Sequence, residues 1–447
     1  MKKVITYGTY DLLHQGHINL LKRAKDLGDY LIVGVTSDSF DRGRGKLNVR
    51  NNVLERVEAV KATGYADEVI IEDYVGQKID DIQKYDVDIF VIGSDWQGKF
   101  DYLSEYCQVV YLPRTEGVSS TMLREESQTV YRIGIVGSGR IAKRFVPEAQ
   151  MVSGVKVTAV YDPTPRQASI FGRHFEIKAF EKDFGAFLAE TDAVYVASPH
   201  LTHYQYVKDS LYAGKHVLCE IPFVLSGGQA KELYDCAEQH NLVLLEASKT
   251  AFCPAFCHLV TLVKSGLIGD VVDVKTSLSK MVGWESRELD VSQGGGAMNE
   301  HAPLNLMAII KLLGKEYNDV EFYTKKEKGV DTYTKANIKY SHATSSVTMG
   351  IGVKTEGNMV VSGTKGYVYV PAPWWLTSYF EVRYEDQTKN KKYFYSYDGE
   401  GLRYEIQEFI SMIVNGHRSC YKLRRRESIV IAEIIEKYNL GINVTEL

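Results

Sequence analysis

The chain is short of the features that mark secreted, membrane and metal-dependent proteins. It has six cysteines in 447 residues, and they are scattered rather than grouped as a disulfide framework. Only Cys253 and Cys257 stand close together, and no further ligand follows at a useful spacing. We therefore expect buried thiols in a reducing compartment and no metal centre. No signal-peptide pattern and no apolar run of membrane-spanning length is present, which predicts a cytoplasmic protein.

An excess of charge of either sign is also lacking. The 53 basic and 57 acidic residues give a net charge of −4, which argues against a nucleic acid or an anionic membrane as the main partner. Internal repeats and low-complexity segments are absent as well. A chain of 447 residues exceeds one ordinary hydrophobic core, so two or three domains are expected.

What the chain does contain is two runs of short apolar strands that alternate with helices such as 16–25 and 51–63. This alternation predicts parallel sheets with helices on both faces. The polar segment 124–129 separates the two runs. The predicted strands are 4–6, 31–35, 68–71, 89–92 and 108–112 in the first run, and 131–136, 155–161, 193–197, 216–220 and 242–246 in the second.

Beyond residue 247 the pattern changes to strands of an open, mostly antiparallel sheet, followed by two closing helices at 404–414 and 425–438. These strands are expected at 270–281, 319–324, 335–340, 345–355, 359–362, 366–370 and 380–384. The predicted fold class is α/β: a Rossmann-like nucleotidyltransferase domain, then a dinucleotide-binding Rossmann domain, then an α+β domain. We place these domains at 1–128, 129–247 and 248–447, and we expect the closing helices to pack back on the second domain.

The first candidate site lies between the first strand and the first helix. His14 and His17 stand at the start of that helix, three residues apart, so they share one face. A helix N-terminus after a strand favours anions. Two imidazoles there are able to donate hydrogen bonds to a phosphoryl group as its charge grows in the transition state. The alternative interpretation is two structural histidines that cap the helix.

Residues 1–126 resemble a glycerol-3-phosphate cytidylyltransferase along their whole length. The resemblance rests on Gly8-Thr9-Tyr10-Asp11 with His14-x-Gly16-His17, on the block 93–101, and on the block 114–121. It implies that His14 and His17 stabilise the transferring phosphate, while Lys46 and Arg114 neutralise the phosphates and Arg56 assists. By itself, Lys46 would be interpreted as a solvated loop lysine. The remaining residues implied to bind CTP or phosphate are Gly8, Thr9, Tyr10, Asp11, Ser119, Ser120 and Thr121. Mg²⁺ is expected to arrive with CTP, without a protein ligand that the sequence identifies.

The second candidate site is a dinucleotide pattern at the start of the second run. Gly137-x-Gly139-x-x-Ala142 follows a predicted strand and opens a helix. Asp162 ends the next strand, 25 residues after Gly137, where a carboxylate is expected to hold the adenosine ribose. Asp162 favours NAD, but Arg166 is near enough to accept the 2′-phosphate of NADP, so both cofactors remain open.

Residues 130–447 resemble the glucose-fructose oxidoreductase/inositol dehydrogenase/MocA family, whose members move a hydride between NAD(P) and a sugar or polyol carbon. The segments 198–203, 213–222 and 294–297 carry this resemblance. The residues predicted to bind the cofactor are Gly137, Ser138, Gly139, Arg140, Ile141, Asp162, Ser198, Pro199, His203 and Glu220.

The sequence departs from that family at two positions where proton transfer is expected. Ile221 stands where the family usually has a lysine, and Leu304 stands where it has a histidine. The predicted replacements for the acid/base role are Lys249, Glu300 and His301. Asn299 and Asn305 are further candidates for orienting a substrate. Each of these residues has an alternative structural interpretation.

The two halves together predict an enzyme that makes a CDP-activated polyol from CTP and a sugar-alcohol phosphate. The second half would reduce a keto- or aldehyde-sugar phosphate, or its CDP derivative, with NAD(P)H. Such a product would serve a surface polymer such as a capsule or teichoic acid. One alternative is a glycerol-3-phosphate cytidylyltransferase with an inert oxidoreductase-like scaffold. The other is an NAD-dependent epimerase or eliminase in the second half. A homo-oligomer is expected, by resemblance to both families.

Overall fold

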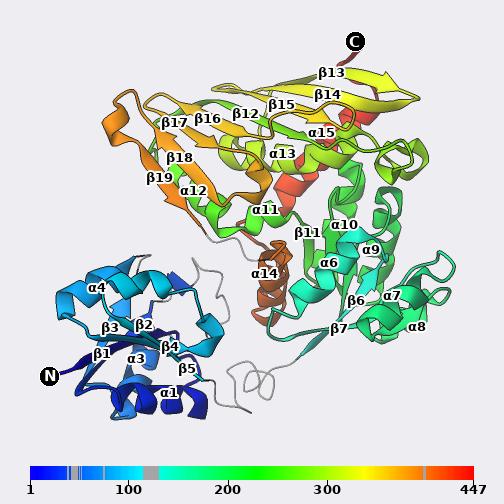
Figure 1. The fold of residues 1–447 in the computed structure, drawn as a ribbon. Helices are drawn as coiled ribbons and strands as arrows, with labels where there is room; N and C mark the ends of the chain where they lie inside the picture. Colours follow the sequence, from blue (N-terminus) through cyan, green and yellow to red (C-terminus); the bar gives the residue numbers. More distant parts are fainter. Residues whose placement is uncertain are drawn as a thin grey trace. The chain divides into compact units, whose positions relative to one another are not determined.

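The computed structural model describes residues 1–37, 40–41, 49, 51, 53–73, 76–113, 130–395 and 399–447. The chain divides into two compact units, Met1–Thr129 and Val130–Leu447 (Figure 1). Each unit is described by itself. The predicted site residues Lys46, Arg114, Ser119, Ser120 and Thr121 lie outside the described residues.

The described part of the first unit is a parallel sheet of five strands in the order β3-β2-β1-β4-β5. Its elements are β1 (Lys3–Gly8), α1 (Gln15–Lys25), β2 (Tyr30–Thr36), α3 (Val53–Ala62), β3 (Glu68–Glu72), α4 (Gln77–Tyr85), β4 (Ile89–Gly93) and β5 (Gln108–Leu112). Leu21 of α1 and Val60 of α3 pack on one face of the sheet, and Ile82 of α4 packs on the other. The strand order reverses between β1 and β4, and ligands of open α/β sheets bind at such a reversal.

The second unit begins with a parallel sheet that has six strands in its described residues, in the order β11-β10-β9-β6-β7-β8. Its elements are β6 (Tyr131–Val136), α6 (Arg140–Ala149), β7 (Val155–Tyr161), α7 (Gln167–Phe175), β8 (Lys178–Phe180), α8 (Phe184–Ala189), β9 (Ala193–Val196), α9 (His203–Tyr212), β10 (His216–Glu220), α10 (Gly227–Gln239) and β11 (Leu244–Ala247). Phe145 of α6 and Phe171 of α7 belong to the core on one face. Helices α8, α9 and α10 supply the core on the other. The order reverses between β6 and β9.

The rest of the second unit is a mixed sheet, described with nine strands in the order β19-β18-β17-β16-β12-β15-β14-β13-β20. Its elements are α11 (Lys249–Phe252), α12 (Pro254–Lys264), β12 (Val271–Ser279), α13 (Ala297–Leu313), β13 (Asp319–Glu327), β14 (Val330–Lys339), β15 (Thr344–Gly350), β16 (Met359–Gly363), β17 (Tyr367–Val370), β18 (Tyr379–Arg383), β19 (Lys391–Phe394), α14 (Leu402–Val414), α15 (Arg425–Asn439) and β20 (Val444–Glu446). Helices α13 and α15 cover one face of this sheet (Figure 1). Helix α14 packs against α6, and α15 packs against α10. The predicted α/β fold class, with two Rossmann-like sheets and a larger C-terminal sheet, is confirmed.

Several predicted strand limits are wrong, and each has a local cause. The strand predicted at 335–340 begins five residues earlier, because Lys328 and Gly329 form a two-residue turn with φ of 53° and 82° that pairs β13 with β14. The strand predicted to reach residue 355 ends at Gly350, where an added Cβ would lie 2.4 Å from the carbonyl oxygen of Val353. The chain therefore turns back tightly at this glycine.

Candidate active sites

The first unit places its two candidate histidines side by side. The chain leaves β1 through Tyr10 and Leu12, both with positive φ (52° and 47°), and this sharp turn brings it to the start of α1. The rings of His14 and His17 are stacked with their centroids 3.9 Å apart. Nδ1 of His14 accepts a hydrogen bond from the Gly16 amide at 3.1 Å. Since Nδ1 is an acceptor, the neutral ring carries its proton on Nε2, which is the tautomer needed to donate to an anion.

The turn after β1 is supported by a buried arginine. The Arg56 guanidinium donates to the carbonyl oxygens of Thr9 at 2.7 Å and Thr36 at 2.9 Å, and its NH1 lies 3.3 Å from Asp41 Oδ2. Arg56 is 1% exposed. The described contacts of its guanidinium stabilise the nucleotide turn, and its predicted assistance in phosphate binding stays a prediction. Asp41, which also accepts from the Thr9 hydroxyl at 3.1 Å, had no sequence motif to mark it.

The other members of the first motif are also largely buried. Asp11 is 1% exposed, and its carboxylate accepts from the Asn51 amide at 3.0 Å. Tyr10 is 2% exposed, burial raises the pKa of its hydroxyl, and its ring meets His17 edge-on at 5.4 Å between centroids. Tyr10 therefore supports the histidine pair, and Asp11 ties the turn to the backbone at Asn51. Gly8 ends β1, and Gly93 ends the adjacent β4, at the reversal point of the sheet.

Replacing Arg56 with methionine tests its structural role. We expect the free energy of unfolding of the first unit to fall by about 3–5 kcal/mol, because the buried Asp41 carboxylate and the carbonyl oxygens of Thr9 and Thr36 would lose the guanidinium that contacts them. Hydrogen exchange of the β1 and β2 amides in the full chain measures this change. Lys25→Met, which removes the partly exposed ion pair with Asp67, is the matched control and should cost about 1 kcal/mol or less. Unchanged exchange in Arg56→Met would contradict the structural role.

The second unit forms a cradle at the start of α6. Gly137 has a φ of 96°, and an added Cβ would lie 2.6 Å from the Ala197 carbonyl oxygen, so only glycine fits between β6 and β9. A Cβ at Gly139 would meet no described atom within 4 Å, so open space lies in front of the helix N-terminus. The backbone amide and hydroxyl of Ser138 donate to Asp162 Oδ2 at 3.0 and 2.6 Å. Close backbone approach, open space and a fixed carboxylate fit a dinucleotide. Arg140 and Ile141 form the first turn of α6.

The loops after β9 and β10 are tied together by His203. Its ring nitrogens lie 2.8 Å from the carbonyl oxygens of Pro222 and Ser198, and the side chain is 1% exposed. These two contacts make His203 a clamp between the two loops, and its predicted contact with the cofactor stays a prediction. Ser198 accepts from the Thr202 hydroxyl at 2.7 Å, and Pro199 precedes a short 3-10 helix. Both remain at the edge of the sheet where the cofactor is predicted.

Glu220 ends β10 immediately before Ile221. Its carboxylate accepts from the Tyr195 hydroxyl at 2.5 Å and from the Ile221 amide at 3.2 Å. Burial raises the pKa of Glu220 to about 7, while the hydrogen bonds and the positive charge of Lys249 oppose the rise. Lys249 begins α11 directly after β11, and its Nζ donates to the Glu400 carbonyl oxygen at 2.8 Å.

The two other candidate acid/base residues start α13. Glu300 lies 2.9 Å from Arg287 and 3.5 Å from His200 Nδ1, so it belongs to an ionic cluster rather than standing alone. His301 is 9% exposed, and burial lowers its pKa to about 4, which keeps the ring neutral at pH 7. Asn299 donates to the Gly294 carbonyl oxygen at 3.1 Å, and Asn305 donates to that of His301 at 2.7 Å. These amides hold the backbone of the helix start.

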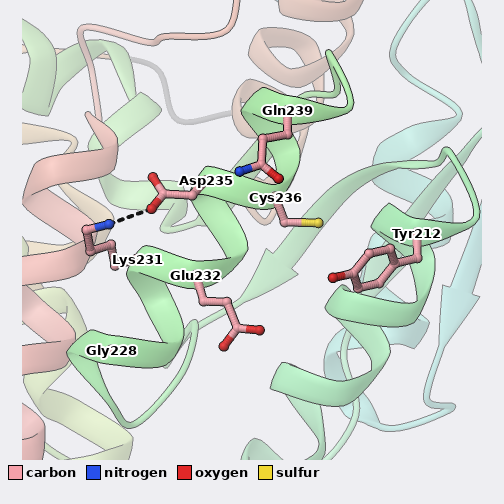
Figure 2. Close-up of a pocket in the computed structure, with 7 residues that line it drawn as sticks. All are labelled: Tyr212, Gly228, Lys231, Glu232, Asp235, Cys236 and Gln239. Carbon is pink, nitrogen blue, oxygen red and sulfur yellow. Dashed lines mark hydrogen bonds and ion pairs between the residues drawn. The ribbon is translucent and has the colours of Figure 1, made fainter.

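A pocket of about 330 Å³ lies elsewhere, between α9 and α10 (Figure 2). Lys231 and Asp235 form an ion pair of 2.5 Å at its wall, and burial raises the pKa of the Cys236 thiol. It contains none of the predicted site residues. Among the described residues, no group of three or more histidines, cysteines or acidic residues is arranged to hold a metal ion. No described helix is long and apolar enough to cross a membrane.

Comparison with known proteins matches both units. Residues 5–126 match the cytidylyltransferase-like family, and residues 131–248 and 256–369 match the oxidoreductase family with an NAD-binding Rossmann fold and the GFO/IDH/MocA C-terminal domain. The glycerol-3-phosphate cytidylyltransferase of Bacillus spizizenii is 53% identical over 131 residues, which are 28% of this chain and 97% of that protein. The chain is a cytidylyltransferase fused to a GFO/IDH/MocA oxidoreductase.

The oxidoreductase unit has more distant relatives. A trans-1,2-dihydrobenzene-1,2-diol dehydrogenase from Oryctolagus cuniculus is 28% identical over 327 residues, which are 70% of this chain and 98% of that protein. A 3-ketoreductase from Actinomadura kijaniata, solved with NADP and TDP-benzene, shares the fold with a TM-score of 0.64, at 20% identity, over 71% of this chain and 99% of its own. Both predicted family resemblances are thus confirmed, and the residue roles within each unit remain predictions.

Proposed function

We propose that this enzyme makes a CDP-activated polyol for a cell-surface polysaccharide. The cytidylyltransferase unit would join CTP to a polyol phosphate and release pyrophosphate. The oxidoreductase unit would reduce a keto- or aldehyde-sugar phosphate before that step, or its CDP derivative after it, with NAD(P)H. A four- to six-carbon polyol phosphate explains the fusion better than glycerol 3-phosphate, because it gives the second unit a substrate to reduce.

The observation that supports the proposal is that each unit has, at the end of its first strand, the geometry that a nucleotide site needs. In the cytidylyltransferase unit, the stacked pair of His14 and His17 stands at a helix N-terminus, with the His14 proton on Nε2. In the oxidoreductase unit, open space lies before Gly139, and Ser138 fixes the Asp162 carboxylate beside it. A purely structural scaffold would need neither the open space nor the fixed carboxylate, which favours a working second unit.

Pyrophosphate release from CTP and Mg²⁺ tests the proposal against a panel of phosphates, with and without NADPH or NADH. The panel holds glycerol 3-phosphate, pentitol and hexitol phosphates, and the matching ketose phosphates. We expect a ketose phosphate to release pyrophosphate only when reduced cofactor is present, if reduction comes first. If activation comes first, a ketose phosphate releases pyrophosphate alone, and its CDP product then oxidises the cofactor.

Two results would refute the coupled reaction. Release with glycerol 3-phosphate alone, with no cofactor binding by the full chain, would mean that the second unit is an inert scaffold. Tight cofactor binding without net cofactor turnover on any panel member or its CDP derivative would favour an epimerase or eliminase that oxidises its substrate only transiently.

A further inference from the structure

Ile221 stands where the family usually has a lysine, but another lysine, Lys249, follows the neighbouring strand β11. Strands β10 and β11 are parallel, and Glu220 is paired with Ala247, so Lys249 follows only two residues beyond the partner of Glu220. Adjacent strands lie about 4.8 Å apart, which the long, flexible stem of a lysine easily spans. Lys249 therefore lies beside the end of β10, and its Nζ donates to the Glu400 carbonyl oxygen at 2.8 Å. Its charge acts on Glu220.

A third ionisable residue, Glu405, lies at this place on α14, which is far along the chain from β10. Glu405 is 0% exposed, and within the described part of the chain neither of its carboxylate oxygens has a hydrogen-bond partner. Helix α14 packs against α6, α11 and β10, and this packing encloses the side chain. Figure 1 shows α14 beside α6 and α11. An ionised carboxylate without donors is very costly to bury, so Glu405 is expected to keep its proton.

The groups that face Glu405 come from every element packed around it. Glu220 lies on β10, Lys249 on α11, and Glu148 on α6, and all three act on its charge. Glu148 is already neutralised by Arg403, whose NH2 lies 2.7 Å from its carboxylate. Tyr195 on β9 is held by Glu220. Burial and the negative charge of Glu220 both raise the pKa of Glu405 well above its ordinary range.

Two carboxyl groups in one dry site do not ionise together. Glu220 has two hydrogen-bond donors and Glu405 has none among the described residues, so Glu220 takes the negative charge and Glu405 keeps the proton. Lys249 then balances the single charge. The cluster is thus close to neutral while still holding two transferable protons, one on Lys249 and one on Glu405.

We propose that Lys249 is the catalytic acid of the oxidoreductase unit and that Glu405, acting through Lys249 and Glu220, is a positioning residue that stores its proton. This inference rests on the proposed reduction of a sugar carbonyl. It selects Lys249 over Glu300 and His301, because Glu300 is bound to Arg287 and the His301 ring is neutral.

The proton and electron balance of this step is simple. NAD(P)H, when bound, would supply the hydride that the carbonyl carbon of the sugar receives. The carbonyl oxygen receives the π electron pair and takes a proton from Lys249 Nζ, which gives the alcohol. Glu405 has no hydrogen-bond partner among the described residues, so its carboxyl group must turn to Glu220 to pass on its proton. The neutral amine of Lys249 then regains a proton from Glu220, and Glu405 is reprotonated from solvent. One carbonyl, one hydride and one solvent proton are consumed for each alcohol formed.

The protonation of Glu405 is measurable without any substrate. Infrared difference spectra of the full chain with bound NADP, wild type minus Glu405→Gln at pH 7, should show the C=O stretch of a protonated carboxylic acid. Lys249→Met should raise the pH at which Glu405 ionises, because a positive charge is lost. Glu220→Gln should lower it, because a negative charge is lost. A carboxylate band at pH 7 in place of the acid band would overturn the proposal that Glu405 stores a proton.

Kinetics test the catalytic part, with a pentulose 5-phosphate, a hexulose 6-phosphate and their CDP derivatives as probes. Lys249→Met should lower kcat for NAD(P)H oxidation by about 10²–10⁴-fold, the usual contribution of a general acid. Glu405→Gln should shift the alkaline limb of the kcat pH profile to lower pH and leave KM unchanged. In this variant Lys249 would take its proton from solvent instead of from Glu405, and proton uptake from solvent slows as the pH rises.

Glu408→Gln is the matched control, because Glu408 lies on the same helix and is paired with Lys422 at 2.8 Å. It should leave the pH profile unchanged. Reduction at a wild-type rate by Lys249→Met would overturn the assignment of the acid. If no probe oxidises the cofactor in the wild type, the proposed function fails, while the infrared arm still decides whether Glu405 holds a proton.

Discussion

His17→Ala should lower the rate of pyrophosphate release from CTP by about 10²–10³-fold, the loss expected when one preorganised donor to a transition-state charge is removed. The ring of His17 stacks on that of His14 at 3.9 Å and is supported edge-on by the buried Tyr10. This packing fixes the donor before the substrate binds, so its loss is expected mainly in kcat rather than in KM for CTP. The measurement is steady-state pyrophosphate release with the best phosphate of the panel.

Gln15→Ala is the matched control for this prediction. Gln15 stands between the two histidines on α1, is exposed, and donates to Asn19 at 2.8 Å. Its loss should change the rate by less than about threefold, since its side chain is exposed and is held by Asn19. NAD(P) binding by the second unit should be the same in both variants. A nearly wild-type rate for His17→Ala would show that the histidines only cap the helix.

Gly139→Ala should abolish measurable NAD(P) binding, or weaken it by at least about tenfold, without unfolding the second unit. An added Cβ at this position meets no described atom within 4 Å, so the free protein tolerates it. The same Cβ fills the space in which the backbone must approach a pyrophosphate group. Fluorescence titration with NADPH and NADH measures the binding, and thermal unfolding measures the stability.

Two other glycines make this prediction specific. Gly228→Ala places a Cβ in the first turn of α10, 3.6 Å from the Ser226 hydroxyl, and should leave cofactor binding unchanged. Gly137→Ala should instead destabilise the unit itself, because of the positive φ and the 2.6 Å approach to Ala197. Wild-type affinity in Gly139→Ala would mean that the cofactor, if it binds, does not cross this turn. Pyrophosphate release by the first unit should be normal in all three variants.

The amino-acid sequence by itself determined the two families and the alternation that gives the parallel sheets. Local patterns carry this information: apolar β-branched runs, glycines at strand ends, and two motifs whose members are close in the chain. The histidine pair belongs to this class, because a helix brings residues three apart onto one face. The start of β14 could not be predicted from the apolar pattern of the strand residues. It is set by the turn at Lys328 and Gly329, whose φ angles are both positive.

Only the tertiary structure decided which polar residues share a site. Arg56 lies on α3, Thr9 in the turn after β1 and Asp41 beyond the end of β2, so no spacing in the chain predicts their buried network. Glu405 is 185 positions from Glu220 and reaches it only because α14 packs beside β10. Burial, which decides whether a carboxyl group keeps its proton, is a property of the assembled core. The sequence therefore names the chemistry of each half, and packing decides which side chains are able to perform it.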